Sequence, residues 1–170
     1  MFIAPDQIIN NFDIRPGQVV ADFGSGSGHY VMAAARKMNG DGVVYAIDIQ
    51  KNLLESVKSA AEKNHLGNVE IIWADVEGKE GVKLASGSVD LVIISNLLFQ
   101  LTDKEAAAKE AHRVLKDGGK AAVIDWTKMM TGGGVVFPKQ EAEKLFLQQG
   151  FAEEKEFEAG DNHYGIIFKK

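Results

Sequence analysis

The stretch that decides the fold is Val19-Val20-Ala21-Asp22-Phe23-Gly24-Ser25-Gly26-Ser27-Gly28-His29-Tyr30. Its first half is an apolar run that predicts a buried β-strand, and three alternating glycines separate this strand from a segment with helical spacing. Glycine has no Cβ and adopts positive φ readily, so the turn is tight and the main chain can approach a ligand closely. The free N–H groups at the start of the helix would face a carboxylate or a ribose. The stretch therefore predicts a loop that binds a polar, charged ligand.

Three further apolar runs end in polar side chains. Residues 43–48 end at Asp48, residues 69–73 lead to Asp75, and residues 89–94 lead to Asn96. Each run has the length and composition of a buried strand. Doubly wound α/β folds hold ribose hydroxyls at the end of the second strand, and the carboxylate of Asp48 can accept two hydrogen bonds from a vicinal diol. The pattern therefore predicts a nucleotide-type ligand along these strand ends.

Strands and helices alternate along the chain, which predicts a parallel sheet covered by helices on both faces. We expect helices near residues 4–10, 29–38, 51–64, 103–116 and 138–149. The tail changes character, because the strand-like runs 151–157 and 163–168 are separated by a connection short enough for an antiparallel hairpin.

The glycine spacing D-x-G-x-G-x-G differs from the dinucleotide fingerprint G-x-G-x-x-G. It resembles motif I of the class I S-adenosylmethionine-dependent methyltransferases. Residues 110–126 look like the helix, glycine turn and fifth strand of that family, with the strand at 121–126, so the resemblance runs from about residue 19 to 126. It implies a Rossmann-like, doubly wound α/β sheet of seven strands, mostly parallel, with an antiparallel C-terminal strand. It also implies S-adenosyl-L-methionine as cofactor and S-adenosyl-L-homocysteine as product.

The resemblance also implies roles for individual residues. In the family, the acid after the third strand meets the adenine amino group, and the segment after the fourth strand borders the site of methyl transfer; Asp75 and Asn96 match these positions. The expected cofactor-binding residues are Asp22, Gly24, Ser25, Gly26, Gly28, Asp48, Ile49, Asp75, Val76 and Asn96.

A length of 170 residues fits one domain. We expect a short N-terminal helix and lead-in over 1–18, a cofactor-binding core over 19–126, and a loop, last helix and terminal hairpin over 127–170. The loop 127–136 contains three glycines and is either a lid or a plain connection. Because the segment before the glycine loop is only about one helix long, a second copy of the chain or a partner subunit could cover an open cleft.

Composition excludes several classes of function. The formal charge of −5 argues against an autonomous nucleic-acid binder, and the absence of cysteine removes disulfides, thiolate metal sites and cysteine nucleophiles. The absence of cysteine also disfavours resemblance to arsenite methyltransferases and to pyrimidine C5 methyltransferases that attack through cysteine. The tandem Asp-Asn that holds a metal after strand five of catechol O-methyltransferases is missing, so no metal is expected. Without an apolar run of roughly 18 residues or a signal peptide, we expect a cytoplasmic protein with no membrane span.

Three side chains are candidates for catalysis. Asp125 ends the fifth strand and is either a base or orienting group or a partner for the following loop. Asn96 either binds substrate or ties the loop after strand four. His29 lies beside the glycines and is either a ligand contact or a helix cap. His112 is expected to be structural, and neither His65 nor His163 carries an indicated role.

The predicted reaction is methyl transfer by direct in-line displacement to a small acceptor. The residues after the fourth strand either form an apolar wall or serve helix packing, and they are Leu97, Leu98, Phe99 and Leu101. A second wall across the cleft is predicted from Trp126, Met129 and Met130. The acceptor is therefore expected to be apolar or aromatic and to react through oxygen or carbon. The alternatives are methylation of RNA or protein through an open cleft, a catalytically silent cofactor-binding subunit, and an NAD-dependent oxidoreductase. The glycine spacing and the terminal hairpin oppose the last of these.

Overall fold

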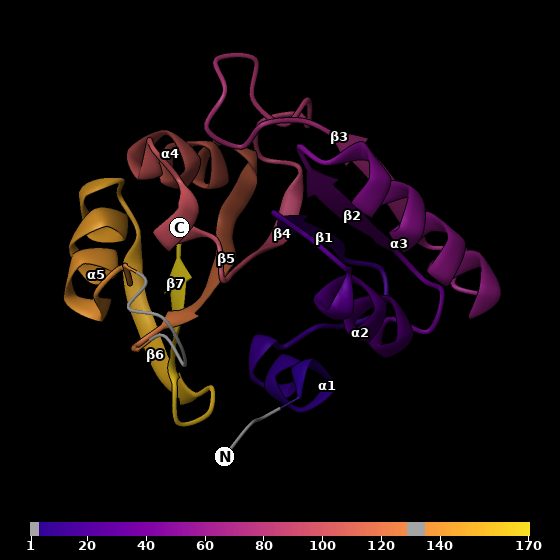
Figure 1. Cartoon of the computed structure of the whole chain (residues 1–170), viewed down its shortest axis with the longest axis horizontal. Coiled ribbons are helices and arrows are strands. Elements are labelled where there is room, and N and C mark those ends of the chain that lie inside the picture. Colours follow the sequence, from indigo (N-terminus) through magenta and orange to yellow (C-terminus); the bar gives the residue numbers. More distant parts are fainter. Residues whose placement is uncertain (1–3, 129–134) are drawn as a thin grey trace.

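The computed structural model describes residues 4–128 and 135–170. Its central feature is a sheet with strand order β3-β2-β1-β4-β5-β7-β6 (Figure 1). The strands are β1 (Val19–Phe23), β2 (Val43–Asp48), β3 (Val69–Trp73), β4 (Val89–Ser95), β5 (Leu115–Trp126), β6 (Ala152–Glu158) and β7 (His163–Lys169). The predicted α/β sheet of seven strands is confirmed.

Strand direction follows the expected pattern. β1 to β5 run parallel to one another, whereas β7 runs antiparallel to both β5 and β6. The strand order reverses between β1 and β4, and open α/β sheets bind ligands at such a point, outside the carboxyl ends of the strands. The predicted terminal hairpin is confirmed, and the reversed β7 brings its first residue to the edge where the parallel strands end.

Helices cover both faces of the sheet, as predicted. Those of the described residues are α1 (Pro5–Ile8), α2 (His29–Lys37), α3 (Lys51–Lys63), α4 (Lys104–Val114) and α5 (Lys139–Gln148), with short 3-10 turns η1 (Ile9–Phe12) and η2 (Leu98–Gln100). Figure 1 shows α1, α2 and α3 on one face of the sheet and α4 and α5 on the other. No helix in the described part of the chain is both long and apolar enough to span a membrane.

The sheet is buried on both faces, which explains the nearly continuous apolar runs. Alternate residues of one strand serve different cores: Leu91 and Ile93 pack toward α1, α2 and α3, whereas Val92 and Ile94 pack toward α4 and α5. Each fully buried side chain of this size contributes about 1.5–3 kcal/mol to folding. The fold therefore holds the strand ends rigidly.

One boundary differs from the prediction. The expected helix 103–116 ends at Val114, and β5 begins at Leu115 rather than at residue 121. Val89 pairs with Leu115 and Leu91 pairs with Lys120, so residues 116–119 form a bulge inside the strand. The glycine turn of the sequence is therefore this bulge, and pairing with β4 resumes beyond it.

Candidate functional site

The glycine loop is fixed between β1 and β2. Gly24, Gly26 and Gly28 all have positive φ, at 70°, 52° and 77°. The amides of Gly24 and Ser25 both donate to the carbonyl of Ile47, at 2.8 and 2.9 Å. Main-chain bonds to the adjacent strand therefore hold the loop in place without any ligand.

Two of these glycines have different physical tasks. A Cβ at Gly28 would lie 2.7 Å from Cγ2 of Val57, so a side chain there would push α3 away from the loop. A Cβ at Gly26 would meet nothing closer than 4.0 Å, and this residue lines a cavity. Gly28 thus serves packing, whereas Gly26 leaves bare main chain facing open space.

The cavity has a volume of about 400 Å³ and lies at the carboxyl ends of β1 and β4. Its walls are polar at one end and apolar at the other. The polar end is formed by Asp22, residues 24–27, His29, Ser95 and Asn96, and the other end by Pro5, Ile8, Ile124, Ala159 and His163. Tyr30 and Gln100 complete the lining. The N-terminal helix α1 therefore contributes part of the wall.

Asp22 is the buried acid of this cavity. Only 2% of it is exposed, and burial together with the nearby charge of Asp48 raises the pKa of its carboxyl to about 8. A group with this pKa is largely protonated at neutral pH and ionises readily when a cation is placed beside it. The site is thus prepared for a positively charged ligand group.

Several polar atoms around the cavity have no protein partner. Within the described residues, Ser25 Oγ, Asn96 Oδ1 and His163 Nε2 are buried without a hydrogen bond. Such atoms cost about 1–3 kcal/mol each unless a ligand or water satisfies them. Asn96 also adopts a left-handed conformation, with φ of 52°, while its carbonyl accepts a 2.6 Å bond from Gln100 Nε2. Unsatisfied atoms and a strained backbone at one cavity are typical of a binding site.

Asp48 lies beside this cavity, and only 7% of this residue is exposed. Its Oδ2 accepts a bond of 2.9 Å from the Gly26 amide, and its Oδ1 accepts one of 2.9 Å from the Gln50 amide. Each carboxylate oxygen can accept a second hydrogen bond. Asp48 therefore fixes the glycine loop and still has acceptor capacity for a ligand.

A second cavity, of about 310 Å³, lies past the ends of β2 and β3. Its lining includes Ile49, which is 63% exposed, together with Trp73, Asp75 and Gly78. Trp73 Nε1 donates to the carbonyl of Ile49 at 3.0 Å, and Lys51 Nζ stands 3.8 Å from the Trp73 ring centroid. Two exposed apolar surfaces beside an acid form a slot suited to a flat, partly polar group. Val76, by contrast, is buried in the core.

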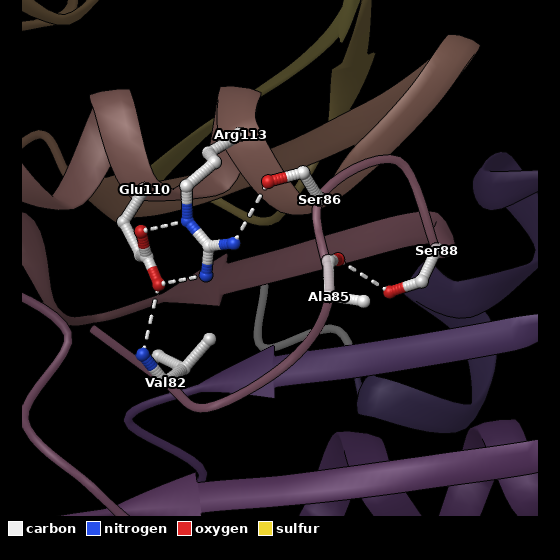
Figure 2. Close-up of polar contacts among 6 residues, drawn as sticks. All are labelled: Val82, Ala85, Ser86, Ser88, Glu110 and Arg113. Atoms are coloured by element: carbon white, nitrogen blue, oxygen red, sulfur yellow. Dashed lines mark hydrogen bonds and ion pairs between the residues drawn. The ribbon is translucent and has the colours of Figure 1, made fainter. Parts of the chain in front are cut away.

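An irregular segment, residues 76–88, forms the outer part of this second cavity and takes the place of a helix between β3 and β4. Side chains of α4 hold it (Figure 2). Glu110 Oε1 accepts from the Val82 amide at 2.8 Å, and its two oxygens bind Arg113, which donates to Ser86 Oγ at 3.1 Å. Arg113 keeps the pKa of the Glu110 carboxyl below its usual range, so the clamp is ionic at neutral pH.

Of the three predicted catalytic residues, Asn96 and His29 line the first cavity, whereas Asp125 does not. Asp125 is fully buried, and its Oδ1 accepts from the Trp126 amide at 2.8 Å. Burial raises the pKa of this carboxyl to about 6, while the amides of Trp126, Phe99 and Leu98 oppose the rise. Oδ2 has no well-aligned hydrogen bond among the described residues. The geometry is that of an acid tying β5 to the turn η2.

The leucines of the first predicted apolar wall do not line this cavity. Leu98 is fully buried, and Leu97 and Leu101 pack against the core beneath α4 and α5, because η2 turns them away from the cavity. The residues that provide the apolar wall are Pro5, Ile8, Ile124 and Ala159. Met129, Met130 and most of the expected lid 127–136 lie outside the described residues.

His163 is one of the lining residues that sequence reasoning missed. It is the first residue of β7, and the reversed direction of this strand was the signal that could have located it at the ligand-binding edge. His112, in contrast, packs edge-on against Phe151 at 5.0 Å, as expected for a structural residue. No group of three or more His, Cys, Asp or Glu side chains within residues 4–128 and 135–170 is arranged to hold a metal ion.

Comparisons with known proteins agree with this architecture. A family model described as a methyltransferase domain matches residues 14–143. Among solved structures, a SAM-dependent methyltransferase from Aquifex aeolicus is 24% identical with a TM-score of 0.86, covering 97% of this chain and 88% of that one. A putative type 11 methyltransferase from Sulfolobus solfataricus is 26% identical with a TM-score of 0.72, covering 96% and 89%.

Curated relatives are similar to about two thirds of this chain. The ubiquinone/menaquinone biosynthesis C-methyltransferase UbiE of Hydrogenovibrio crunogenus is 32% identical over 68% of this chain and 45% of the relative. The arsenite methyltransferase of Halobacterium salinarum is 32% identical over 66% of this chain and 28% of the relative. The chain spans less than half the length of these relatives.

The second relative corrects one expectation. The absence of cysteine disfavoured resemblance to arsenite methyltransferases, yet 66% of the chain aligns with one at 32% identity. With a family model that matches well over half its length, the chain belongs to the class I S-adenosylmethionine-dependent methyltransferases.

Proposed function

We propose that this chain binds S-adenosyl-L-methionine and directs its methyl group by in-line displacement to a small apolar or aromatic acceptor, at an oxygen or a carbon atom. One observation carries the proposal. The cavity of about 400 Å³ at the point where the strand order reverses has an acidic, glycine-rich end and an apolar end. A charged donor and an apolar acceptor can thus meet within one cavity.

The residues at the polar end fit the cofactor. Asp22 would face its ammonium group, and the free N–H groups of α2 would face its carboxylate, because Gly28 caps this helix without a side-chain bond. Ser25 Oγ and Asn96 Oδ1 would find their missing partners in the same ligand. The cofactor supplies a methyl group already activated on a sulfonium.

The other parts of the cofactor fit the adjoining positions. Asp48 would accept from the two ribose hydroxyls with the remaining lone pairs of its carboxylate. Ile49 would cover the adenine in the second cavity, Asp75 would accept from its amino group, and Val76 would support the slot from the core. An extended ligand would follow the strand ends from β4 through β1 to β2 and β3.

The size of the cavity favours a small acceptor over RNA or protein. About 400 Å³ must hold the methionine end of the cofactor and the acceptor together, and this lies near the lower limit of small-molecule pockets. The relatives named as ubiquinone/menaquinone C-methyltransferases support an aromatic acceptor methylated on carbon. An arsenite acceptor receives no such support, because the chain has no cysteine.

Calorimetric titration tests the cofactor first. Wild-type protein is titrated with S-adenosylmethionine, S-adenosylhomocysteine and NAD, and we expect binding of the first two only. Asp48→Ala should bind both adenosyl ligands much more weakly, whereas the exposed Asp41→Asn serves as a matched control and should bind as wild type. Binding of NAD alone would contradict the proposal.

Transfer of a labelled methyl group to a panel of phenols, quinols and short apolar acids then tests catalysis. Cofactor binding with no transfer to any of them would favour the silent-subunit alternative. Transfer to RNA or protein substrates in preference to small molecules would favour the open-cleft alternative.

A further inference from the structure

The reversed last strand delivers a histidine to the acceptor end of the cavity. His163 is the first residue of β7 and pairs with Trp126, the last residue of β5. The two rings pack in a tilted arrangement, with centroids 4.0 Å apart and an interplanar angle of 37°. The Thr127 amide donates to the carbonyl of Asn162 at 2.8 Å, which fixes the turn before β7 against the end of β5. The imidazole is therefore held firmly in position.

The chemistry of this imidazole matches its location. His163 lines the cavity together with Ile8, Ile124 and Ala159, and its Nε2 is buried without a hydrogen-bond partner among the described residues. Burial lowers the pKa of the ring below its usual range, so the ring is neutral at physiological pH. With its proton on Nδ1, a neutral ring offers Nε2 as an acceptor. The acceptor end of the cavity thus has one basic nitrogen beside an aliphatic wall.

Other titratable groups near this cavity are placed for different tasks. Asp22 and the exposed His29 belong to the glycine-loop end, and burial raises the pKa of Tyr30 to about 12, so its phenol stays protonated. Asp125 on β5 is fully buried and does not line the cavity. Asp161 lies in the turn that precedes His163.

We propose that the acceptor is a hydroxyl-bearing aromatic compound and that His163 receives the proton of its hydroxyl group; this inference rests on the proposed methyl transfer. The O–H bond breaks, its electron pair stays on the acceptor oxygen, and the proton forms an N–H bond with Nε2 to give an imidazolium. In the resulting oxyanion, the electron density is higher both on the oxygen and on the neighbouring ring carbons. The imidazolium later returns its proton to water.

The apolar wall supports this acceptor class. A flat ring would lie against Ile8, Ile124 and Ala159, which offer contact area and no hydrogen bonds from their side chains. One hydroxyl group would satisfy Nε2, which is otherwise buried without a partner among the described residues. An arene without a hydroxyl group would leave that atom unsatisfied.

The test uses 4-nitrophenol, whose phenolate absorbs visible light, with protein saturated by S-adenosylhomocysteine so that no turnover occurs. At the same pH we expect 4-nitrophenol bound to wild type to show more phenolate than 4-nitrophenol bound to His163→Gln or His163→Asn. Both variants should retain their affinity for S-adenosylhomocysteine. The exposed His65→Asn is the matched control and should behave as wild type.

Each outcome bears on a different claim. Failure of wild type to bind S-adenosylhomocysteine would defeat the proposed function itself. Two outcomes would overturn this inference alone. In the first, wild type binds the cofactor but not 4-nitrophenol, and in the second, both His163 variants keep the full phenolate signal. As a second readout, methyl transfer to a phenol at saturating cofactor should fall in wild type as the pH drops through the lowered pKa of His163, and this decrease should be absent from His163→Gln.

Discussion

The Asp48 carboxylate accepts a hydrogen bond of 2.9 Å from the Gly26 amide, so the end of β2 holds the glycine loop that follows β1. The acid expected to bind ribose therefore also shapes the loop expected to bind the methionine end. Substitutions at Asp48 should affect both parts of the site.

We expect Asp48→Ala to weaken binding of S-adenosylhomocysteine by tenfold or more, because hydrogen bonds to a charged group contribute about 1.5–3 kcal/mol each. Asp48→Asn keeps one acceptor oxygen and should fall between wild type and Asp48→Ala. Calorimetry gives the affinities, with Asp41→Asn as control. Equal affinity in Asp48→Ala and wild type would remove Asp48 from the site.

Cofactor affinity should depend on pH through Asp22. The pKa of this carboxyl is about 8 in the ligand-free protein, and a cationic ligand group favours the ionised form, so binding below pH 8 releases a proton. Affinity for S-adenosylhomocysteine should therefore rise with pH, by at most about tenfold per unit, and level off above pH 8. Calorimetry in buffers of different ionisation enthalpy measures the released proton. Asp22→Asn should abolish this pH dependence, and a wild-type affinity that is flat from pH 6 to 8 would contradict the prediction.

Asp125 should act through the turn that it holds. Asp125→Ala leaves the Trp126 amide without its partner at 2.8 Å, and this loss should lower the free energy of unfolding by about 1–3 kcal/mol. Turnover should fall as well, whereas cofactor affinity should change little. Asp125→Asn keeps an acceptor oxygen and should retain most of the turnover. Urea denaturation, turnover and calorimetry separate these effects. If Asp125→Asn lost as much turnover as Asp125→Ala at unchanged stability, the charge itself would be required and a role as base would be favoured.

The sequence predicted the strand ends well because each is fixed by local chemistry. An apolar run, an acid and a glycine turn locate Asp22, Asp48 and the glycine loop with little dependence on distant residues. The antiparallel hairpin was likewise predictable from two short runs and a tight connection.

The acceptor end was harder to predict because it is assembled from segments far apart in the chain. Ile8, Ile124, Ala159 and His163 come from four different segments, and none has a sequence motif. Leucines after β4 resembled a pocket wall, but η2 turns them into the core, and only tertiary packing decides that orientation. Whether a second copy of the chain or a partner covers the cleft stays a prediction.

The clamp between α4 and residues 76–88 leads to the last prediction (Figure 2). Residues 76–88 border the slot that includes Ile49 and Asp75. One acid of this segment and one acid of α4 each accept a hydrogen bond from a main-chain amide of the other side. Glu77 Oε2 accepts from the Asp103 amide at 2.6 Å, and Glu110 Oε1 accepts from the Val82 amide at 2.8 Å. Glu110→Ala should leave the Val82 amide unpaired and free Arg113, so the segment loses its fixed position beside the slot.

We therefore expect Glu110→Ala to weaken binding of adenosine and S-adenosylhomocysteine by a similar factor, roughly threefold to thirtyfold, because the loss is confined to the adenine end. Glu110→Gln can still accept from Val82 and should bind more tightly than Glu110→Ala. The matched control is Glu105→Gln, at an exposed position on the same helix. Thermal melting in the absence of ligand separates a local from a global effect. If Glu110→Ala melts at a lower temperature but binds adenosine as tightly as wild type, the clamp serves folding only.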